Sequence, residues 1–186
     1  KKKRIVKEKN KKKTQYVLKD NMFKFYYEFI PKAISVIEMG HGEIYYKKVV
    51  KPLIHLFMGP VFENMCRYYT LKHGIQNEFG SFITNVGSWW GSELIVNEYN
   101  EKKVQSADID VVGISPLDKS FIVGECKFKN EKVDKNVYLT LVRRAKLIKT
   151  NYKLTKYILF SLSGFTSYFI EKNDNDLILI SLDMMY

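Results

Sequence analysis

The chain has 186 residues, with 31 Lys and Arg against 20 Asp and Glu, and a formal net charge of +11 at pH 7. This length allows one domain with a short appendage, and 46% hydrophobic and 15% aromatic residues are enough for a core. Apolar runs long enough for a transmembrane helix are absent, and the basic N-terminus lacks the apolar segment of a signal peptide. Two cysteines and three scattered histidines predict neither a disulfide framework nor a zinc site, and they favour the cytoplasm, away from membranes.

Most of the positive charge lies at the N-terminus. Residues 1–13 hold nine basic residues and one acidic residue, so +8 of the +11 lies there. A charge block of this kind is about as often a solvated segment as a nucleic-acid contact. Residues 1–20 alternate β-prone stretches with a Lys/Asn-rich turn, which predicts a basic β-hairpin like the wing of a winged helix. The absence of an initiator Met suggests that the chain is part of a longer protein.

Residues 21–58 are expected to form a helical connector. Asp20 is typical of a helix cap, and the aromatic segment that follows it ends at Pro31. The later helical stretches of the connector are broken by a Gly-His-Gly sequence and by a further proline. A new helix with an apolar stripe is predicted to begin at Gly59 and Pro60, with the proline at its first position.

The rest of the chain alternates strand-like and helix-like patterns. The strand-like stretches are residues 81–90, 94–98, 107–114, 120–128, 157–162 and 177–182. A polar loop is expected over residues 100–106, an amphipathic helix over 133–150 and a short helix over 167–172. The order from residue 60 to residue 162 is therefore αβββαβ, which predicts an α/β fold.

A hairpin around a turn at residues 117–118 carries the charged residues of chemical interest. With the turn centred there, Asp110 lies opposite Glu125 and Asp108 lies opposite Lys127, and all four side chains project from one face. Their directly opposed Cβ atoms would be about 4.5–5.5 Å apart. Two carboxylates this close repel each other unless a cation lies between them, and oxygen ligands suit Mg²⁺ or Mn²⁺.

The same four residues also allow a purely structural interpretation. Asp108 and Lys127 could form a cross-strand ion pair on an exposed face, with Asp110 solvated. Against this, the acids lie within strongly apolar strands, where a charged residue needs a reason. We therefore expect Lys127 to stand beside a metal site, where it can orient a water molecule or neutralise developing charge.

The arrangement of Asp110, fourteen further residues and then Glu125-Cys126-Lys127 resembles the PD-(D/E)XK nuclease superfamily. Ile109 stands in place of the proline of the superfamily's name, a position that varies widely. The resemblance implies a restriction-endonuclease-like core over residues 59–186, with a mixed central sheet flanked by helices. It also implies an acidic residue on the first core helix, and Glu63 occupies that place.

A narrower resemblance covers nearly the whole chain from about residue 14. The segments VFENMC, GSWW, DIDVV and GECK are similar to the uncharacterised C-terminal domain of archaeal and bacterial AAA-like ATPases, in which a P-loop ATPase and a winged helix come first. Asp108 stands where many relatives have Glu. The chain has no Gly-x-x-x-x-Gly-Lys-Ser/Thr segment, so any ATPase activity belongs to the missing N-terminal part.

These resemblances imply metal-dependent hydrolysis of DNA phosphodiester bonds. Glu63, Asp110 and Glu125 would hold one or two Mg²⁺ or Mn²⁺ ions, the backbone carbonyl of Cys126 would be a further ligand, and Lys127 would position the attacking water. The side chain of Cys126 points to the opposite face, so it is expected to pack in the core.

The expected partners are DNA and the ATPase part of the same chain, and an oligomer is compatible with the sequence. Arg143 and Lys146 on the basic helix are the candidate phosphate contacts, although such a face is often only solvated. One of Trp89 and Trp90 is expected to pack in the core, and Trp90 is the candidate for stacking on a base. Two alternatives remain open, a catalytically silent nuclease-fold module that binds DNA or regulates the ATPase, and a toxin-like nuclease held inactive by it.

Overall fold

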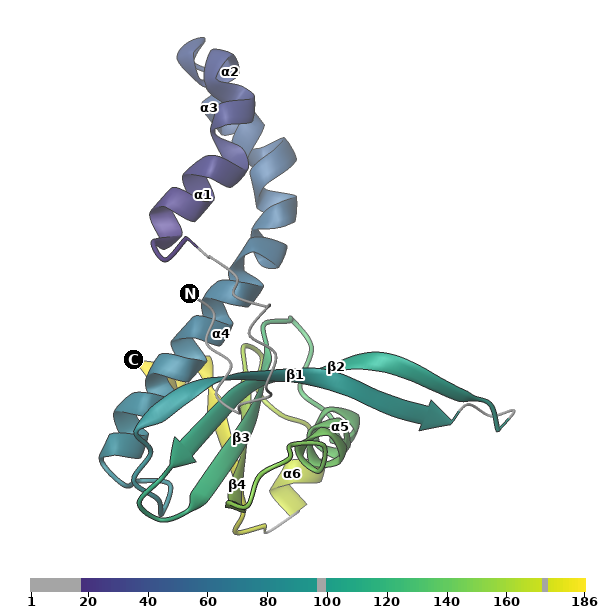
Figure 1. Cartoon of the computed structure of the whole chain (residues 1–186). Helices are drawn as coiled ribbons and strands as arrows, with labels where there is room; N and C mark the ends of the chain where they lie inside the picture. The colour runs from purple at the N-terminus through teal and green to yellow at the C-terminus, as the bar shows by residue number, and fades with distance from the viewer. Residues whose placement is uncertain (1–17, 97–99, 172–173) are drawn as a thin grey trace.

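The computed structural model describes residues 18–96, 100–171 and 174–186 (Figure 1). Its helical elements are α1 (Asn21–Phe29), η1 (Pro31–Ala33), α2 (Ile34–Glu38), α3 (Gly42–Tyr45), the π-helical turn η2 (Tyr46–Val50), α4 (Lys51–Ile75), α5 (Lys135–Ala145), α6 (Tyr168–Glu171) and η3 (Leu182–Met185). Residues 1–17 of the predicted wing lie outside the described part of the chain. No helix in the described part combines the length and the apolar character needed to cross a membrane.

Five strands form one mixed sheet in the order β1-β2-β3-β4-β5. They are β1 (Asn85–Val96), β2 (Lys102–Ser115), β3 (Ser120–Lys127), β4 (Lys153–Ser161) and β5 (Leu177–Ser181). The pairs β1–β2 and β2–β3 are antiparallel, whereas β3–β4 and β4–β5 are parallel. The predicted α/β class, with a mixed sheet flanked by helices, is confirmed, and α4 to β4 follow the order αβββαβ.

Helices cover both faces of this sheet, and each face has its own apolar core. The α4 core, on the face under α4, contains Phe62, Cys66, Val111, Ile122, Cys126, Ile158 and Phe160. The α5 core, on the opposite face, contains Trp89, Ile109, Val112, Val123, Leu141, Ala145 and Leu159. The central strand β3 is buried on both faces over almost its whole length, which explains its continuous apolar sequence.

The first core helix does not begin at Gly59, contrary to the sequence prediction. Helix α4 runs without interruption from Lys51 to Ile75, and Pro60 lies inside it. A proline inside a helix removes the bond to the carbonyl four residues earlier, here that of Leu56. Because Leu56 is 73% exposed, water can reach this part of the helix. The predicted boundary between a connector and a nuclease-like domain at residue 59 thus falls within one continuous helix.

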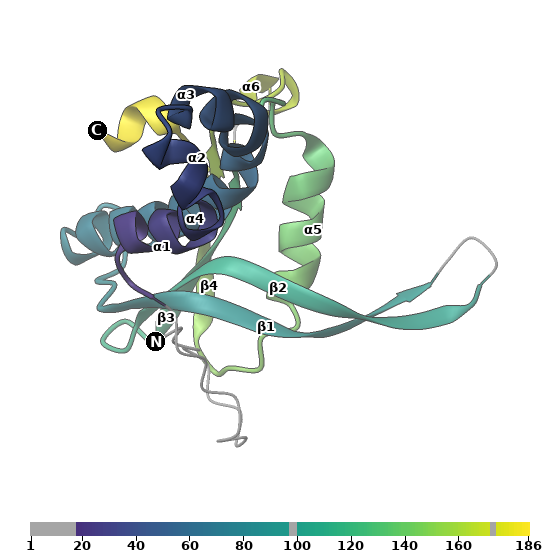
Figure 2. The same cartoon turned by 90° about the horizontal axis from the view of Figure 1, so that it is seen from above.

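The predicted polar loop over residues 100–106 is mostly strand. Strand β2 begins at Lys102, and the two stretches predicted before it form the single strand β1. Together they form a two-stranded ribbon that projects beyond the rest of the sheet (Figure 2). Cross-strand pairs such as Leu94 with Val104 hold it together, and Gln105 donates a hydrogen bond to Glu93 at 2.9 Å. These partners lie ten and twelve residues apart in the sequence, so the polar composition of residues 100–106 did not reveal the strand.

The N-terminal helices form an arm that leads away from the sheet (Figure 1). Asp20 caps α1 as predicted, because its carboxylate accepts the N–H groups of Met22 and Phe23 at 2.8 and 3.1 Å. The rings of Phe25 and Phe29 pack against Phe57 of α4. The outward-facing apolar side chains of the arm remain exposed, among them Met22, Phe23, Tyr27, Met39, Ile44 and Leu56.

Candidate active site

The candidate site lies where β2 separates from β3. The described pairing of these strands runs from Ser115–Ser120 to Val111–Gly124, which confirms the predicted register. One step further this register would place Asp110 opposite Glu125. The pairing stops before that step, so the acid lies at a fork between two strands rather than inside a continuous ladder.

A β-bulge in β2 changes the direction of Asp110. Across β1, Gly87 pairs with Val112 and Trp89 pairs with Ile109, so β2 has one extra residue at this point. As a result Ile109 lies in the α5 core and Val111 lies in the α4 core, although residues two apart in a regular strand share a face. The regular alternation assumed in the sequence prediction therefore fails at Asp110, whereas Glu125 and Lys127 keep a common face on β3.

Asp110 is held in the fork by two hydrogen bonds. Its carboxylate accepts the backbone N–H of Cys126 at 2.9 Å, and its backbone carbonyl accepts Nη1 of Arg67 at 2.7 Å. Burial, followed by the nearby charges of Glu125 and Glu63, raises the pKa of the Asp110 carboxyl to about 7, against the opposing effects of the Cys126 N–H and Lys127. The charged form of this carboxyl is therefore poorly compensated at this position.

Glu63 approaches from α4, one turn before Arg67. Both terminal nitrogens of Arg67 lie 3.4 Å from one carboxylate oxygen of Glu63, and Nη2 donates to Asn64 at 2.8 Å. The Glu63 side chain is 29% exposed, so it retains access to solvent. The sequence prediction that this helical acid lies near the hairpin acids agrees with the effect of its charge on Asp110.

Glu125 and Lys127 form a close ion pair on β3. The Lys127 Nζ lies 2.7 Å from Oε1 of Glu125, whose side chain is 9% exposed. Because Val123 lies in the α5 core and strand side chains alternate, Glu125 lies on the α5 face of the sheet, opposite to α4 and Glu63. Burial raises the pKa of Glu125 against the lowering effect of Lys127.

Lys127 is protonated at neutral pH. Its burial alone would lower the pKa of the ammonium group, but the charges of Glu125 and Asp110 outweigh burial and raise it above its usual value. The side chain is 30% exposed, so the ammonium group is available to a ligand in the fork. Lys127 can therefore act as a hydrogen-bond donor and a positive charge, and it is unsuited to act as a general base.

Asp108 does not pair with Lys127, contrary to the structural alternative. Its carboxylate accepts Nη1 of Arg144 from α5 at 3.0 Å, and the same nitrogen binds its backbone carbonyl at 3.0 Å. Arg144 also lies 3.3 Å from Glu93, and Arg143 lies 2.9 Å from the same carboxylate. These contacts anchor the base of the β1–β2 ribbon to α5.

Sequence reasoning missed Glu93, whose side chain is only 2% exposed. Burial by itself would raise its pKa, but hydrogen bonds from Gln105 and Arg143 and the charges of both arginines of α5 lower it overall. A glutamate in an alternating strand is typical of a solvent-facing position, and the two arginines that contact it lie 50 and 51 residues away. No local signal identified this residue.

The predicted metal ligands are present but do not form a metal-binding group in this conformation. Among residues 18–96, 100–171 and 174–186, no set of three His, Cys, Asp or Glu side chains is arranged to hold a metal ion. Glu63 and Glu125 reach the fork from opposite faces of the sheet, and Arg67 and Lys127 hold them there. The donor atoms, three carboxylates and the Cys126 carbonyl, are hard oxygen ligands and fit Mg²⁺ or Mn²⁺ in chemical type and charge.

The remaining predicted residues lie outside the fork. Trp89 is buried in the α5 core, as expected for one of the tryptophans, and Trp90 is partly exposed. Arg143 is half exposed but bound to Glu93, whereas Lys146 is exposed just after α5. The predicted packing role of the Cys126 side chain is confirmed, because it lies in the α4 core beside Cys66. Burial raises the pKa of the Cys126 thiol far above its usual value, which makes it a poor nucleophile.

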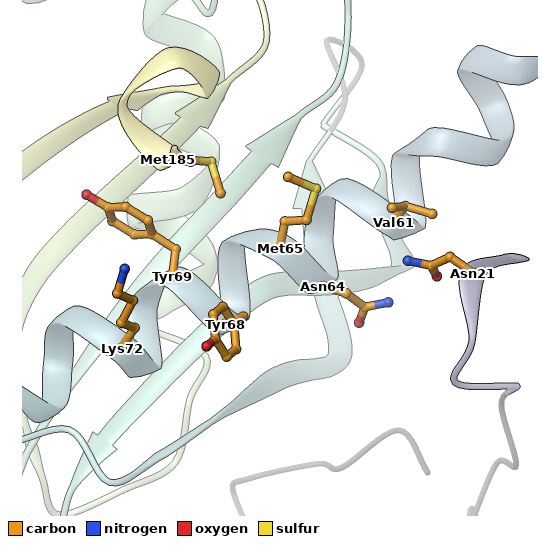
Figure 3. A pocket seen from close by; sticks show the side chains of 8 residues that line it. All are labelled: Asn21, Val61, Asn64, Met65, Tyr68, Tyr69, Lys72 and Met185. Atoms are coloured by element: carbon orange, nitrogen blue, oxygen red, sulfur yellow. The ribbon is translucent and has the colours of Figure 1, made fainter.

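A separate pocket of about 300 Å³ lies along another side of α4 (Figure 3). Its lining residues are Asn21, Val61, Asn64, Met65, Tyr68, Tyr69, Lys72 and Met185. None of these was predicted as a site residue. Asn64 is shared with the surroundings of the fork, because it accepts a hydrogen bond from Arg67.

The fold and the site define an α/β protein with a buried acid at a strand fork, flanked by two further acids and two cations. The chain belongs to DUF234, a family of archaeal and bacterial proteins of unknown function, whose pattern matches residues 26–138. It is 26% identical over 139 residues to the uncharacterized protein MJECL04 of Methanocaldococcus jannaschii, an alignment that covers 74% of this chain and 28% of that protein. The chain thus spans less than a third of this relative's length. No solved structure matches the chain.

Proposed function

We propose that the α4–β5 part of the chain is a metal-dependent phosphodiester hydrolase of the PD-(D/E)XK kind that acts on DNA. The observation that carries the proposal is the position of the Asp110 carboxylate at the strand fork, within electrostatic reach of Glu63 and Glu125 and beside Lys127. Buried acids in mutual repulsion favour a cation, and strongly perturbed acids gather at functional sites.

Three acids of the chain would bind the cation, and Lys127 would act as a hydrogen-bond donor. Asp110 and Glu125 supply oxygen ligands from the two strands, and Glu63 supplies a third from α4, with the Cys126 carbonyl beside them. A divalent cation bound to them would polarise the scissile phosphate and stabilise the leaving oxygen. Lys127, held by Glu125 at 2.7 Å and protonated, would donate to the attacking water or to a phosphate oxygen.

The test is DNA cleavage by the chain with Mg²⁺ or Mn²⁺, on plasmid, linear and branched substrates. Asp110→Asn and Lys127→Ala are expected to lose at least about a hundredfold in rate, the usual effect of removing an electrostatic catalytic group. The matched control is Asp108→Asn, two residues away on the same strand, which should cleave like the wild type. Equal cleavage by the wild type and Asp110→Asn would overturn the proposal.

A second candidate function is a catalytically silent module that binds DNA or regulates an attached ATPase. The observation in its favour is that Arg67 and Lys127 already neutralise Glu63 and Glu125 without a metal. Calorimetric titration with Mn²⁺ separates the two functions. If the folded protein gives no heat of binding with millimolar Mn²⁺ but still binds DNA, the silent module is favoured.

A further inference from the structure

We propose that Arg67 is a positioning residue for the site. It holds the bulged backbone at Asp110 through one strong hydrogen bond, and it holds Glu63 through weak ones that the acid can leave. This inference rests on the proposed function for the role of the acids. The geometry of Arg67 itself is independent of that function.

The bulge leaves the backbone of Asp110 without a strand partner. Asp110 is missing from the register of β2 with β1 and also from the register of β2 with β3. Its carbonyl therefore needs a donor from elsewhere, because an unpaired backbone group at a buried position is costly. Arg67 supplies that donor at 2.7 Å from a helix 43 residues earlier in the chain. The bond fixes the bulge that aims the Asp110 carboxylate at the Cys126 N–H.

The two terminal nitrogens of the Arg67 guanidinium group have strong partners other than Glu63. Nη1 is fixed by the Asp110 carbonyl and Nη2 by Asn64, at 2.7 and 2.8 Å. Both contacts with Glu63 are longer, at 3.4 Å, close to the limit of a hydrogen bond. Arg67 can therefore keep its position while Glu63 turns toward a cation in the fork. Lysine, with a single ammonium group, cannot reproduce this planar arrangement of donors.

The sign of the effect on cation binding tests the positioning role. Arg67 carries a positive charge near the acids, so simple electrostatics predicts that its removal strengthens the binding of a divalent cation. Positioning predicts the opposite, because a ligand carboxylate that is no longer oriented binds more weakly, typically by 10- to 100-fold on loss of the orienting partner. The two explanations cannot both hold for one variant.

The experiment uses the full chain with Arg67→Ala and Arg67→Lys, and Lys72→Ala as the matched control, which removes an exposed positive charge from the same helix. Calorimetry with Mn²⁺ should show binding weakened about tenfold or more in Arg67→Ala, less in Arg67→Lys, and unchanged in Lys72→Ala. In cleavage assays kcat should fall while KM for DNA stays constant. Equal or tighter Mn²⁺ binding by Arg67→Ala would overturn the inference.

A second measurement needs neither metal nor activity. Hydrogen exchange in EDTA should show faster exchange of the Cys126 amide in Arg67→Ala, because the carboxylate that accepts it is no longer fixed. Asn64→Ala, which removes only the outer anchor of Arg67, should give a smaller change in the same direction, and it serves if Arg67→Ala does not fold. Unchanged Cys126 exchange in both variants refutes the positioning role. If the exchange changes but Asp110→Asn cleaves DNA like the wild type, the proposed function fails and the positioning of Asp110 stands.

Discussion

Asp110→Asn is expected to stabilise the folded chain at neutral and alkaline pH. Burial and the neighbouring acids raise the pKa of Asp110 from 3.8 to about 7, so the folded state disfavours its charged form. At about 1.4 kcal/mol for each tenfold change in proton affinity, this rise corresponds to about 4 kcal/mol. The amide side chain keeps an oxygen that can accept the Cys126 N–H but carries no charge.

The sign of the pH dependence follows from linkage. Because the pKa is higher in the folded state than in the unfolded state, the folded protein binds the proton more tightly. The contribution of Asp110 to the free energy of unfolding is therefore most favourable below about pH 4, and it falls as the pH rises to about 7. Since the wild-type side chain can relax toward solvent, about 4 kcal/mol is the upper limit, and we expect a gain of at least about 1 kcal/mol for Asp110→Asn at pH 8.

Urea unfolding followed by tryptophan fluorescence, in EDTA from pH 5 to pH 8, measures this difference. The gain of Asp110→Asn over the wild type should increase from pH 5 to about pH 7 and then level off. Asp108→Asn is the control, since that carboxylate is 70% exposed and should show no such increase. Added Mn²⁺ should stabilise the wild type but not Asp110→Asn. A difference that stays flat from pH 5 to pH 8, or a loss of stability at pH 8, would refute the reasoning.

Four further substitutions test the ribbon anchor, the packing of α4 and the proposed DNA contact. Glu93→Ala should lower the free energy of unfolding at pH 7 by about 3 kcal/mol, because it leaves the arginines of α5 without their buried partner. Since the pKa of Glu93 is lowered in the fold, this loss should shrink in urea titrations as the pH falls below 4.5. Gly74→Ala should lower the free energy of unfolding, measured by thermal unfolding, by about 1–3 kcal/mol. The Cβ of the new alanine would lie 2.5 Å from the Cβ of Ile83. Gly59→Ala, in open space on the same helix, should stabilise by about 0.5–1 kcal/mol. For DNA binding, the logarithm of the binding constant falls linearly with the logarithm of the salt concentration. Lys146→Ala should make this slope shallower by about one, and an unchanged slope would show that Lys146 does not contact DNA.

The sequence was sufficient where short-range patterns decide the structure. The register of the β2–β3 hairpin follows from a turn next to Pro116 and from apolar residues on both strands, and the observed Val111–Gly124 pair agrees with it. The cap at Asp20 was likewise local, because the carboxylate binds N–H groups two and three residues later. The αβββαβ order needed only the change in periodicity between segments.

Long-range contacts decided what the sequence could not show. Pro60 suggested a helix start, but the packing of Phe62 and Cys66 on the sheet and the aromatic contacts of Phe57 with α1 hold one continuous helix on both sides of it. The bulge at Asp110 depends on its pairing with β1, about twenty residues away. Periodicity assumes regular alternation, so it could not predict the bulge that puts Ile109 and Val111 on opposite faces of the sheet and leaves Asp110 at the fork.

The buried acids Glu93 and Asp110 have opposite pKa shifts in this molecule. Around Glu93, a glutamine and two arginines more than offset the cost of burial, so its pKa falls, as expected for a residue that stabilises the fold. Around Asp110 the nearest charges include two further acids, and its pKa rises, so its charged form weakens the fold at neutral pH. An ion pair that served only stability would not leave this charge poorly compensated. A divalent cation in the fork would offset the cost, and Arg67 would keep the bulged backbone in place for it. On these physical grounds we favour cation binding over a purely structural role for the acids of the fork.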